Sequence, residues 1–188
     1  ERACALAVDA DRAEFKNCTI LGSQDTLFIQ LKTHTYFKEC FISGNTDYIF
    51  GDGDAVFDRC ELQWYGYKDQ PAGGYITAVQ NQAPNGCLFL DCTVTSNKEL
   101  QVGEGCFGRP WREGAHVVFL NTILESENMI RAAGWSDMSG GKAENSFFRE
   151  YNTTLQDGTP VDTSGRVKDT VISAEEAAAV HTEDYFAG

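Results

Sequence analysis

Long apolar runs are missing from this chain of 188 residues. No stretch approaches the roughly 18 apolar residues that a membrane-spanning helix requires, so we expect no membrane-embedded segment. The opening residues, ERACALAVDADRAEF, contain no basic segment followed by an apolar one. They therefore show none of the features of a secretion signal.

Positive charge is scarce as well. The sequence has 15 Lys and Arg against 28 Asp and Glu, which gives a net charge of −13. Such an acidic chain is not expected to bind DNA, RNA or an anionic membrane through bulk electrostatics. With only 3 histidines and no C-x-x-C pair, the sequence gives no indication of a zinc site either.

Helical periodicity is absent until residues 173–180, SAEEAAAV. There Ser173 and Glu176 have the spacing of a capping box, which predicts a short C-terminal helix. The remaining segments are short, rich in β-branched and aromatic residues and separated by Gly, Asn and Asp, which is typical of strands. With 42% hydrophobic residues, the chain is long enough to form one domain around a core.

The sequence does contain an internal repeat. Similar segments begin at six phenylalanines, namely Phe15, Phe37, Phe57, Phe89, Phe119 and Phe148. A period of this length is typical of solenoids. Because each set of short strands must return to stack on the previous one, the repeat predicts an all-β, right-handed parallel β-helix over residues 1–188. The longer later intervals predict outward loops, notably at residues 63–75.

A second column follows three residues after each phenylalanine. It consists of Cys18, Cys40, Cys60, Cys92, Thr122 and Tyr151. The chain has 7 cysteines, an odd number, so at least one has no partner within the chain. A cysteine in such a column is expected to be a small buried residue rather than half of a disulfide. We therefore predict that Cys18, Cys40 and Cys60 are free, buried and stacked on one another.

Asp47 stands at an unusual place, immediately before the apolar run Tyr48-Ile49-Phe50. Capping of the preceding turn is one explanation, since Asp commonly does this. A second explanation comes from Asp25, which holds the same strand-entry position 22 residues earlier, an interval that matches the repeat. Stacked coils would place the two carboxylates on neighbouring rungs, about 4.8 Å apart. At that separation one carboxylate tends to stay ionised and the other protonated, as in catalytic acid–base pairs.

Further residues fit such a site. Gln24 precedes Asp25 and offers an amide, while FGRPWR at residues 107–112 offers an arginine that can pair with a carboxylate. The tryptophans Trp111 and Trp135 offer flat faces for a sugar ring.

In this order, GSQDTLF, DYIFG, FGRPWR and AGW resemble the successive motifs of the pectin methylesterases, a carbohydrate esterase family. ALAVDADRAEFKNC before them and ISAEEAAAVHTEDYFAG at the C-terminus are similar to the family as well. The resemblance covers nearly the whole chain. It implies a secreted, cofactor-free pectinesterase with a right-handed parallel β-helix fold, which hydrolyses the C6 methyl esters of homogalacturonan (pectin) to methanol and pectate.

The resemblance also implies roles for individual residues. Asp47 would be the nucleophile that forms an aspartyl acyl-enzyme, and Asp25 the acid and then the base. Gln24 would donate to the oxyanion, and Arg109 would hold Asp47 ionised without a metal. The sugar cleft would be lined by Phe28, Phe50, Trp111 and Trp135. Ordinary core packing is the alternative for each aromatic residue, most of all for Phe50.

The sequence departs from the family pattern at two places. RACAL puts Arg2 where the family has a second oxyanion glutamine, so Arg2 would either stabilise the oxyanion or dock against Asp47. The family's early coils have no counterpart here, which leads us to expect that a separate chain or a precursor segment supplies them.

Two other functions stay open from the sequence. One is a β-helix glycoside hydrolase acting on polygalacturonate, which the tripeptide NTD at residues 45–47 would suit. The family of polygalacturonases also needs an Asp-Asp pair and a His-Gly motif, and neither dipeptide occurs. The other is a non-catalytic pectin-binding module, favoured by Arg2 and by the missing coils.

Overall fold

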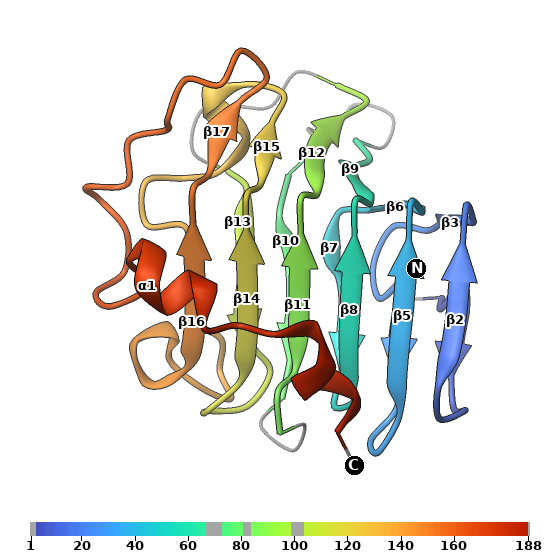
Figure 1. Cartoon of the computed structure of the whole chain (residues 1–188). Coiled ribbons are helices and arrows are strands. Elements are labelled where there is room, and N and C mark those ends of the chain that lie inside the picture. Colours follow the sequence, from blue (N-terminus) through green and yellow to red (C-terminus); the bar gives the residue numbers. More distant parts are fainter. Residues whose placement is uncertain (1–2, 67–72, 81–83, 99–103, 188) are drawn as a thin grey trace.

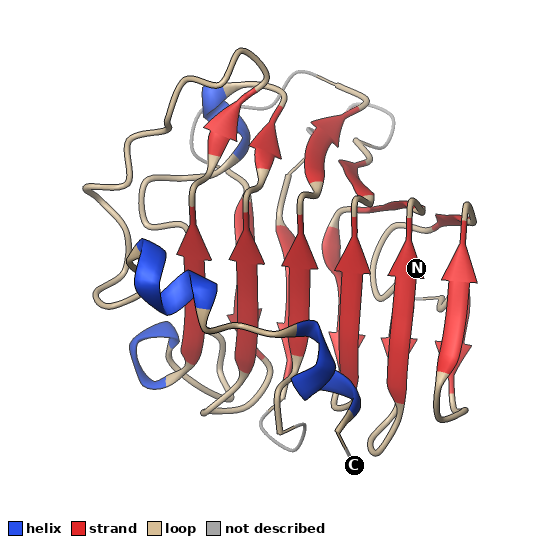
Figure 2. Ribbon diagram, viewed as in Figure 1, coloured by secondary structure: helices blue, strands red, loops and turns tan. Residues whose placement is uncertain are grey.

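The computed structural model describes residues 3–66, 73–80, 84–98 and 104–187. Its strands are wound into three parallel sheets, here called A, B and C (Figures 1 and 2). The chain visits the three sheets in turn on successive coils, and its last two strands, β16 and β17, add to sheets B and C only. This arrangement is the predicted parallel β-helix. Arg2 lies outside the described residues, as does the central part of the predicted loop at 63–75.

The three sheets and the helices have the following bounds. Sheet A consists of β1 (Leu6–Val8), β4 (Leu27–Ile29), β7 (Thr46–Gly51), β10 (Tyr75–Val79) and β13 (Cys106–Pro110). Sheet B consists of β2 (Ala13–Lys16), β5 (His34–Lys38), β8 (Asp54–Asp58), β11 (Cys87–Leu90), β14 (His116–Leu120) and β16 (Phe147–Tyr151). Sheet C consists of β3 (Thr19–Leu21), β6 (Phe41–Gly44), β9 (Glu61–Trp64), β12 (Thr93–Ser96), β15 (Ile123–Leu124) and β17 (Thr154–Leu155). The helical segments are η1 (Glu127–Met129), η2 (Ala143–Asn145), α1 (Ala174–Ala178) and η3 (Thr182–Phe186).

A stack of phenylalanine rings fills the inside of sheet B. The stacked residues are Phe15, Phe37, Phe57, Phe89 and Phe119. Successive ring centroids lie between 5.0 and 4.2 Å apart, and successive planes are tilted by 10° or less. Aromatic rings at this separation bury a large apolar area and add a specific contact energy. The first five members of the predicted repeat are therefore confirmed.

The sixth member of the repeat was predicted in the wrong register. Phe119 pairs with Glu150, whereas Phe148 pairs with Val117 and stacks on Trp135 at 4.3 Å. Glu150 is 1% exposed, and its carboxylate accepts hydrogen bonds from Arg166 Nε and Thr153 Oγ1. A buried charge needs such partners, so an ion pair ends the phenylalanine stack.

The cysteine column is present but differs from the prediction at its two ends. Cys40, Cys60 and Cys92 are buried, and each Sγ lies 3.3 to 3.5 Å from the carbonyl oxygen of the phenylalanine one coil earlier. Cys18, on the first coil, is only half-buried. At the other end, the register places Thr153 rather than Tyr151 after Thr122. All seven cysteines are free thiols.

The C-terminal segment confirms the predicted capping box. Ser173 Oγ accepts a hydrogen bond from the Glu176 N–H, and the Glu176 carboxylate accepts one from the Ser173 N–H. From there α1 and η3 run across the outer face of sheet B (Figure 1). Ala177 and Tyr185 are buried there in an apolar cluster that includes Val56.

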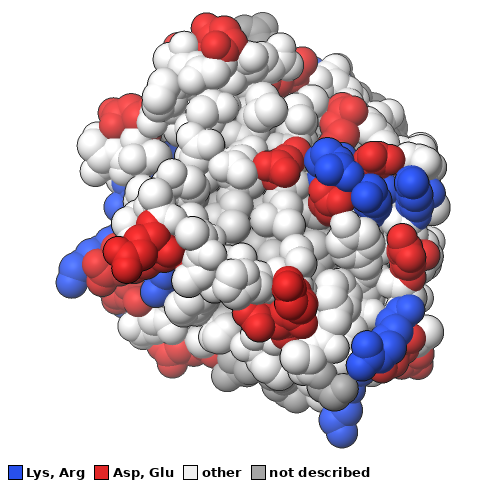
Figure 3. All heavy atoms as spheres, in the orientation of Figure 1, with Lys and Arg blue, Asp and Glu red and all other residues white. Residues whose placement is uncertain are grey.

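Charge is unevenly distributed on this face. Figure 3 shows a largely uncharged centre, with acidic side chains scattered around it and basic side chains at both the right-hand and the left-hand edges. None of the helices among the described residues is both long and apolar enough to span a membrane.

Candidate active site

Asp25 and Asp47 occupy equivalent places on neighbouring coils. Leu27 pairs with Ile49, and Gln24 forms a parallel bridge with Thr46, so the register puts Asp25 beside Asp47. The 22-residue interval seen in the sequence is therefore a true structural register. Both aspartates have left-handed backbone conformations, with φ of 58° and 51°. Such values are uncommon for residues other than glycine, although Asp tolerates them better than most.

A β-bulge explains the position of Asp47. Between the pairs Thr46–Tyr75 and Ile49–Thr77 the register shifts, so that β7 has one residue more than β10. An extra residue in a bulge re-aims its side chain relative to the regular alternation of the strand. Asp47 can thus belong to a buried strand while its carboxylate lines the cavity on sheet A.

Arg109 holds the Asp47 carboxylate with two parallel hydrogen bonds. Its Nε donates to Oδ1 at 2.8 Å and its Nη2 donates to Oδ2 at 2.7 Å. The Asp47 side chain is 7% exposed and that of Arg109 is 20% exposed. A bidentate pair of this kind compensates a buried carboxylate far better than a single contact. Reciprocally, the hydrogen bond to Asp47 raises the pKa of Arg109 above its ordinary value.

The contact between Arg109 and Asp47 depends on a small residue, Ala78, on the strand between them. Phe50 pairs with Ala78, and Ala78 pairs with Arg109, so the three side chains follow one column across sheet A. Ala78 is 3% exposed and contributes only a methyl group. Arg109 can therefore reach over β10 to Asp47 on β7, which lies two strands away.

A cavity of about 100 Å³ opens beside this pair. It is lined by Gln24, Asp25, Asp47, Phe50, Ala78, Trp111 and Met138. Five of these were candidate site residues from the sequence, and the structure brings them together.

Ala78 and Met138 were not anticipated. Ala78 could have been found only by aligning the later coils across the bulge. Met138 lies in a tight turn, and Gly140 of the same turn packs against the backbone carbonyl of Trp111. No motif in the sequence around Met138 indicates that this turn packs beside Trp111.

Three of the four aromatic candidates lie together along sheet A, with Phe28 on β4, Phe50 on β7 and Trp111 directly after β13. The rings of Phe28 and Phe50 are 4.9 Å apart, and those of Phe50 and Trp111 are 6.1 Å apart. All three are half-buried, so part of each ring faces outward. Phe50 is therefore a lining residue, although core packing was its strongest alternative.

The prediction for Trp135 needs correction. Trp135 is 1% exposed, and its ring lies within the core against Phe107, Phe119 and Phe148. Because Phe148 takes one face of the indole, that face is not available to a sugar. The AGW motif places Trp135 in the core and outside the cavity lining.

The donor set suits acyl transfer. Two carboxylates, one clamped by an arginine, and an amide converge on a small cavity with apolar walls. This arrangement supplies a nucleophile, an acid–base group and an oxyanion donor. Among the described residues, no group of three or more His, Cys, Asp or Glu side chains could hold a metal ion.

Comparison with known proteins agrees with this geometry. The sequence model of the family described as Pectinesterase matches residues 1–188. Pectinesterase A of Emericella nidulans is 36% identical over 177 residues, which cover 92% of this chain and 50% of that protein. Pectinesterase/pectinesterase inhibitor 3 of Arabidopsis thaliana is 32% identical over 201 residues, which cover 100% of this chain and 32% of that protein.

Solved structures give the same result. Pectin methylesterase from carrot superimposes with a TM-score of 0.78 at 28% identity, covering 94% of this chain and 56% of that one. The Aspergillus niger pectin methylesterase gives a TM-score of 0.74 at 31% identity, covering 92% and 55%. A pectin methylesterase in complex with a hexasaccharide gives 0.76 at 28% identity, covering 94% and 57%. The chain spans about a third of the length of the Arabidopsis thaliana relative and half of that of the Emericella nidulans relative.

Proposed function

The chain belongs to the pectinesterase family, and from that premise we propose that its site hydrolyses the C6 methyl esters of pectin. The products are methanol and a free galacturonate carboxylate. The observation that supports this most directly is the bidentate Arg109–Asp47 pair beside Asp25 and Gln24 in one cavity.

The first half of the reaction transfers the acyl group to the protein. An Asp47 carboxylate oxygen attacks the ester carbonyl carbon, and the Gln24 amide donates to the oxyanion that forms. Protonated Asp25 gives its proton to the departing methoxide, so methanol leaves. The C6 carbonyl is then bonded to Asp47 as an anhydride.

The second half restores the site. Asp25, now a carboxylate, takes a proton from water, and the resulting hydroxide attacks the C6 carbonyl. The bond to Asp47 breaks, and Asp47 leaves as a carboxylate that Arg109 stabilises. No electron is transferred and no cofactor is consumed.

The substrate and the location belong to the same proposal. The half-buried rings of Phe28, Phe50 and Trp111 supply apolar faces for successive methyl-esterified sugars. Since pectin is a polymer of the plant cell wall, the protein would act outside the cell. Whether other segments complete the barrel stays a prediction, as does the role of Arg2.

Methanol release from highly methyl-esterified pectin tests the function. Asp47→Asn should abolish it, because an amide cannot form the acyl-enzyme. The matched control is Asp91→Asn, the same change at an exposed residue whose φ is also 51°. Shortening of the polymer without methanol release would indicate a glycoside hydrolase, and binding alone would indicate a binding module. Full activity in Asp47→Asn would refute the proposed nucleophile.

A further inference from the structure

Arg109 has to keep one edge of its guanidinium on Asp47 while its side chain crosses a whole strand. A long arginine side chain loses rotamer entropy when it is fixed in one geometry, so it needs contacts that hold it there. Only Nε and Nη2 are engaged with Asp47. Those two bonds constrain the guanidinium edge, but they leave its plane free to swing about the carboxylate.

Tyr75 fixes that plane. The Arg109 Cζ atom lies 3.9 Å from the centroid of the Tyr75 ring, which is van der Waals contact between the guanidinium and the ring face. For comparison, Arg112 lies 5.6 Å from the Trp111 centroid. Arginine stacks on aromatic faces through both dispersion and cation–π attraction.

The backbone of Tyr75 is itself well held. On one side Tyr75 pairs with Thr46, the residue immediately before Asp47, and on the other it pairs with Cys106 on β13. Tyr75 therefore lies between the strand that carries the carboxylate and the strand that carries the arginine. It also stands at the edge of the bulge that re-aims Asp47.

We propose that Tyr75 is a positioning residue, whose ring holds the Arg109 guanidinium in the orientation that clamps Asp47. Tyr75 is not among the residues that line the cavity, so it acts through Arg109 rather than on the substrate. The expected effect of Tyr75 on catalysis rests on the proposed function. The stacking of Arg109 on the Tyr75 ring can be measured without any assay of activity.

Kinetics give the first test, on the full chain with methyl-esterified pectin. Tyr75→Leu should lower kcat by roughly tenfold with little change in KM, because the Arg109 guanidinium loses the ring face that orients it. Tyr75→Phe keeps the ring and should restore kcat. Tyr65→Leu, at a tyrosine that is 42% exposed, serves as the control.

Nuclear magnetic resonance gives the second test, and it separates the positioning role of Tyr75 from the proposed esterase function. In the unmodified protein, the side-chain protons of Arg109 should be shifted upfield by the Tyr75 ring current, with the signal assigned through its loss in Arg109→Lys. Tyr75→Leu should abolish the shift and Tyr75→Phe should keep it. Absence of methanol release from the unmodified protein would reject the function alone. An unshifted Arg109 signal in the unmodified protein, or an unchanged kcat in Tyr75→Leu, would overturn the positioning role.

Discussion

At the scale of single residues, the site depends on two aspartates in a backbone conformation that most residues avoid. Strained backbone costs of the order of 1–3 kcal/mol per residue and persists only where the surroundings enforce it. Here the parallel ladder on both sides of β7 and the clamp from Arg109 enforce it. Asn tolerates left-handed φ about as well as Asp, so Asp47→Asn tests the charge and the nucleophile rather than the fold.

Ala78 gives a prediction about the space beneath Arg109. Ala78→Leu should reduce methanol release by roughly a hundredfold, because the larger side chain fills the cavity and displaces Arg109 from Asp47. The expected loss of stability is about 1–3 kcal/mol, as for other overpacked sites. Ala78→Ser adds only one atom and should retain most of the activity. Normal activity in Ala78→Leu would mean that Arg109 reaches Asp47 by another path.

Asp54 gives a prediction about pH. Asp54 is 3% exposed, and burial raises its pKa, although its Oδ1 accepts hydrogen bonds from the Asn85 and Gly86 N–H groups. A carboxyl with a raised pKa in the folded state favours folding in its protonated form, so its contribution to stability falls as the pH rises. The nearby charge of His34 opposes this shift.

Replacement of Asp54 by Asn mimics the neutral carboxyl. The variant should match or exceed the parent in thermal stability at neutral pH, and this advantage should shrink as the pH falls and Asp54 takes up a proton. Thermal melts across the acid range measure it, with Asp91→Asn as the exposed control. A variant that is clearly less stable at neutral pH would show that the charge itself holds the turn at Asn85 and Gly86.

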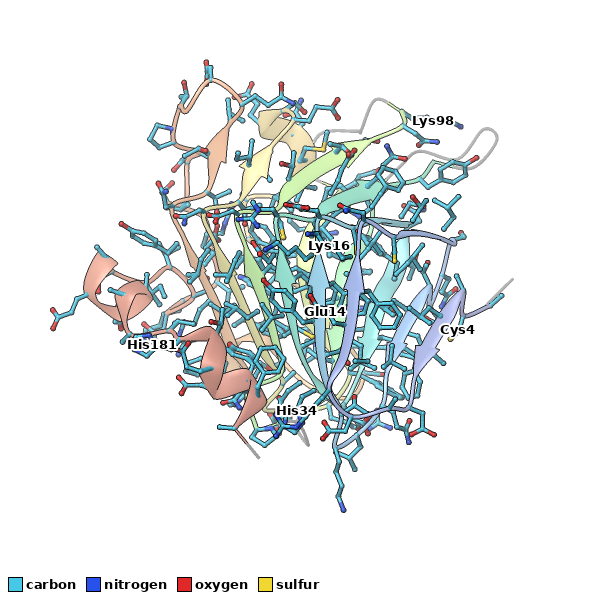
Figure 4. All side chains as sticks on the ribbon, turned by 45° about the vertical axis from the view of Figure 1, so that its right-hand side comes forward. Cys4, Glu14, Lys16, His34, Lys98 and His181 are labelled. Atoms are coloured by element: carbon cyan, nitrogen blue, oxygen red, sulfur yellow. The ribbon has the colours of Figure 1, made fainter. Side chains whose placement is uncertain are left out.

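At the scale of elements, the cysteine column provides a direct check of the coil register. Cys40, Cys60 and Cys92 should resist alkylation in the native protein and react fully after denaturation. Cys4 is exposed beside β1 and should react first, although burial and the charge of Asp25 raise its pKa and so slow the reaction (Figure 4). Mass spectrometry of the labelled peptides measures the order. Rapid native labelling of Cys60 would contradict the stacked coils.

The register of the sheets could be predicted as far as the repeat keeps its chemistry. Five coils carry Phe at the same place, and their spacing was sufficient to align them. On the last coil Glu150 takes the phenylalanine position, so the pattern of apolar residues pointed to Phe148 instead. Asn121 and Asn152 occupy the same turn on successive coils, and both have left-handed backbone, with φ of 56° and 54°. Aligning the last two coils on these two asparagines would have given the correct register.

The site was predictable where it follows that register and not elsewhere. The interval between Asp25 and Asp47 places the two carboxylates together. Trp135 and Met138 depend on how the segments after β15 fold back, which no periodicity encodes. The same holds for Tyr75, because its contact with Arg109 arises from the path of a long side chain across a bulge.

At the scale of the whole molecule, the net charge of −13 should repel the product of the proposed reaction, because that product is a polyanion. Raising the salt concentration from about 10 mM to about 150 mM shortens the range of this repulsion. KM for sparsely esterified pectin should therefore fall with salt while kcat stays constant. Highly esterified pectin carries little charge and should show a smaller change. A KM that rises with salt would indicate that basic residues at the cleft attract the polymer.

The C-terminal segment has a consequence for the way the barrel comes apart. In a solenoid each coil contacts only its neighbours, so order can be lost coil by coil from an end. Here Ala177 and Tyr185 belong to one apolar cluster with Val56, Leu88 and Val118, which lie on three successive coils. Fraying of any one of these coils exposes part of a surface that all of them share. The C-terminal segment therefore couples coils that are not adjacent. Because of this coupling, we expect the three coils to unfold together rather than one after another.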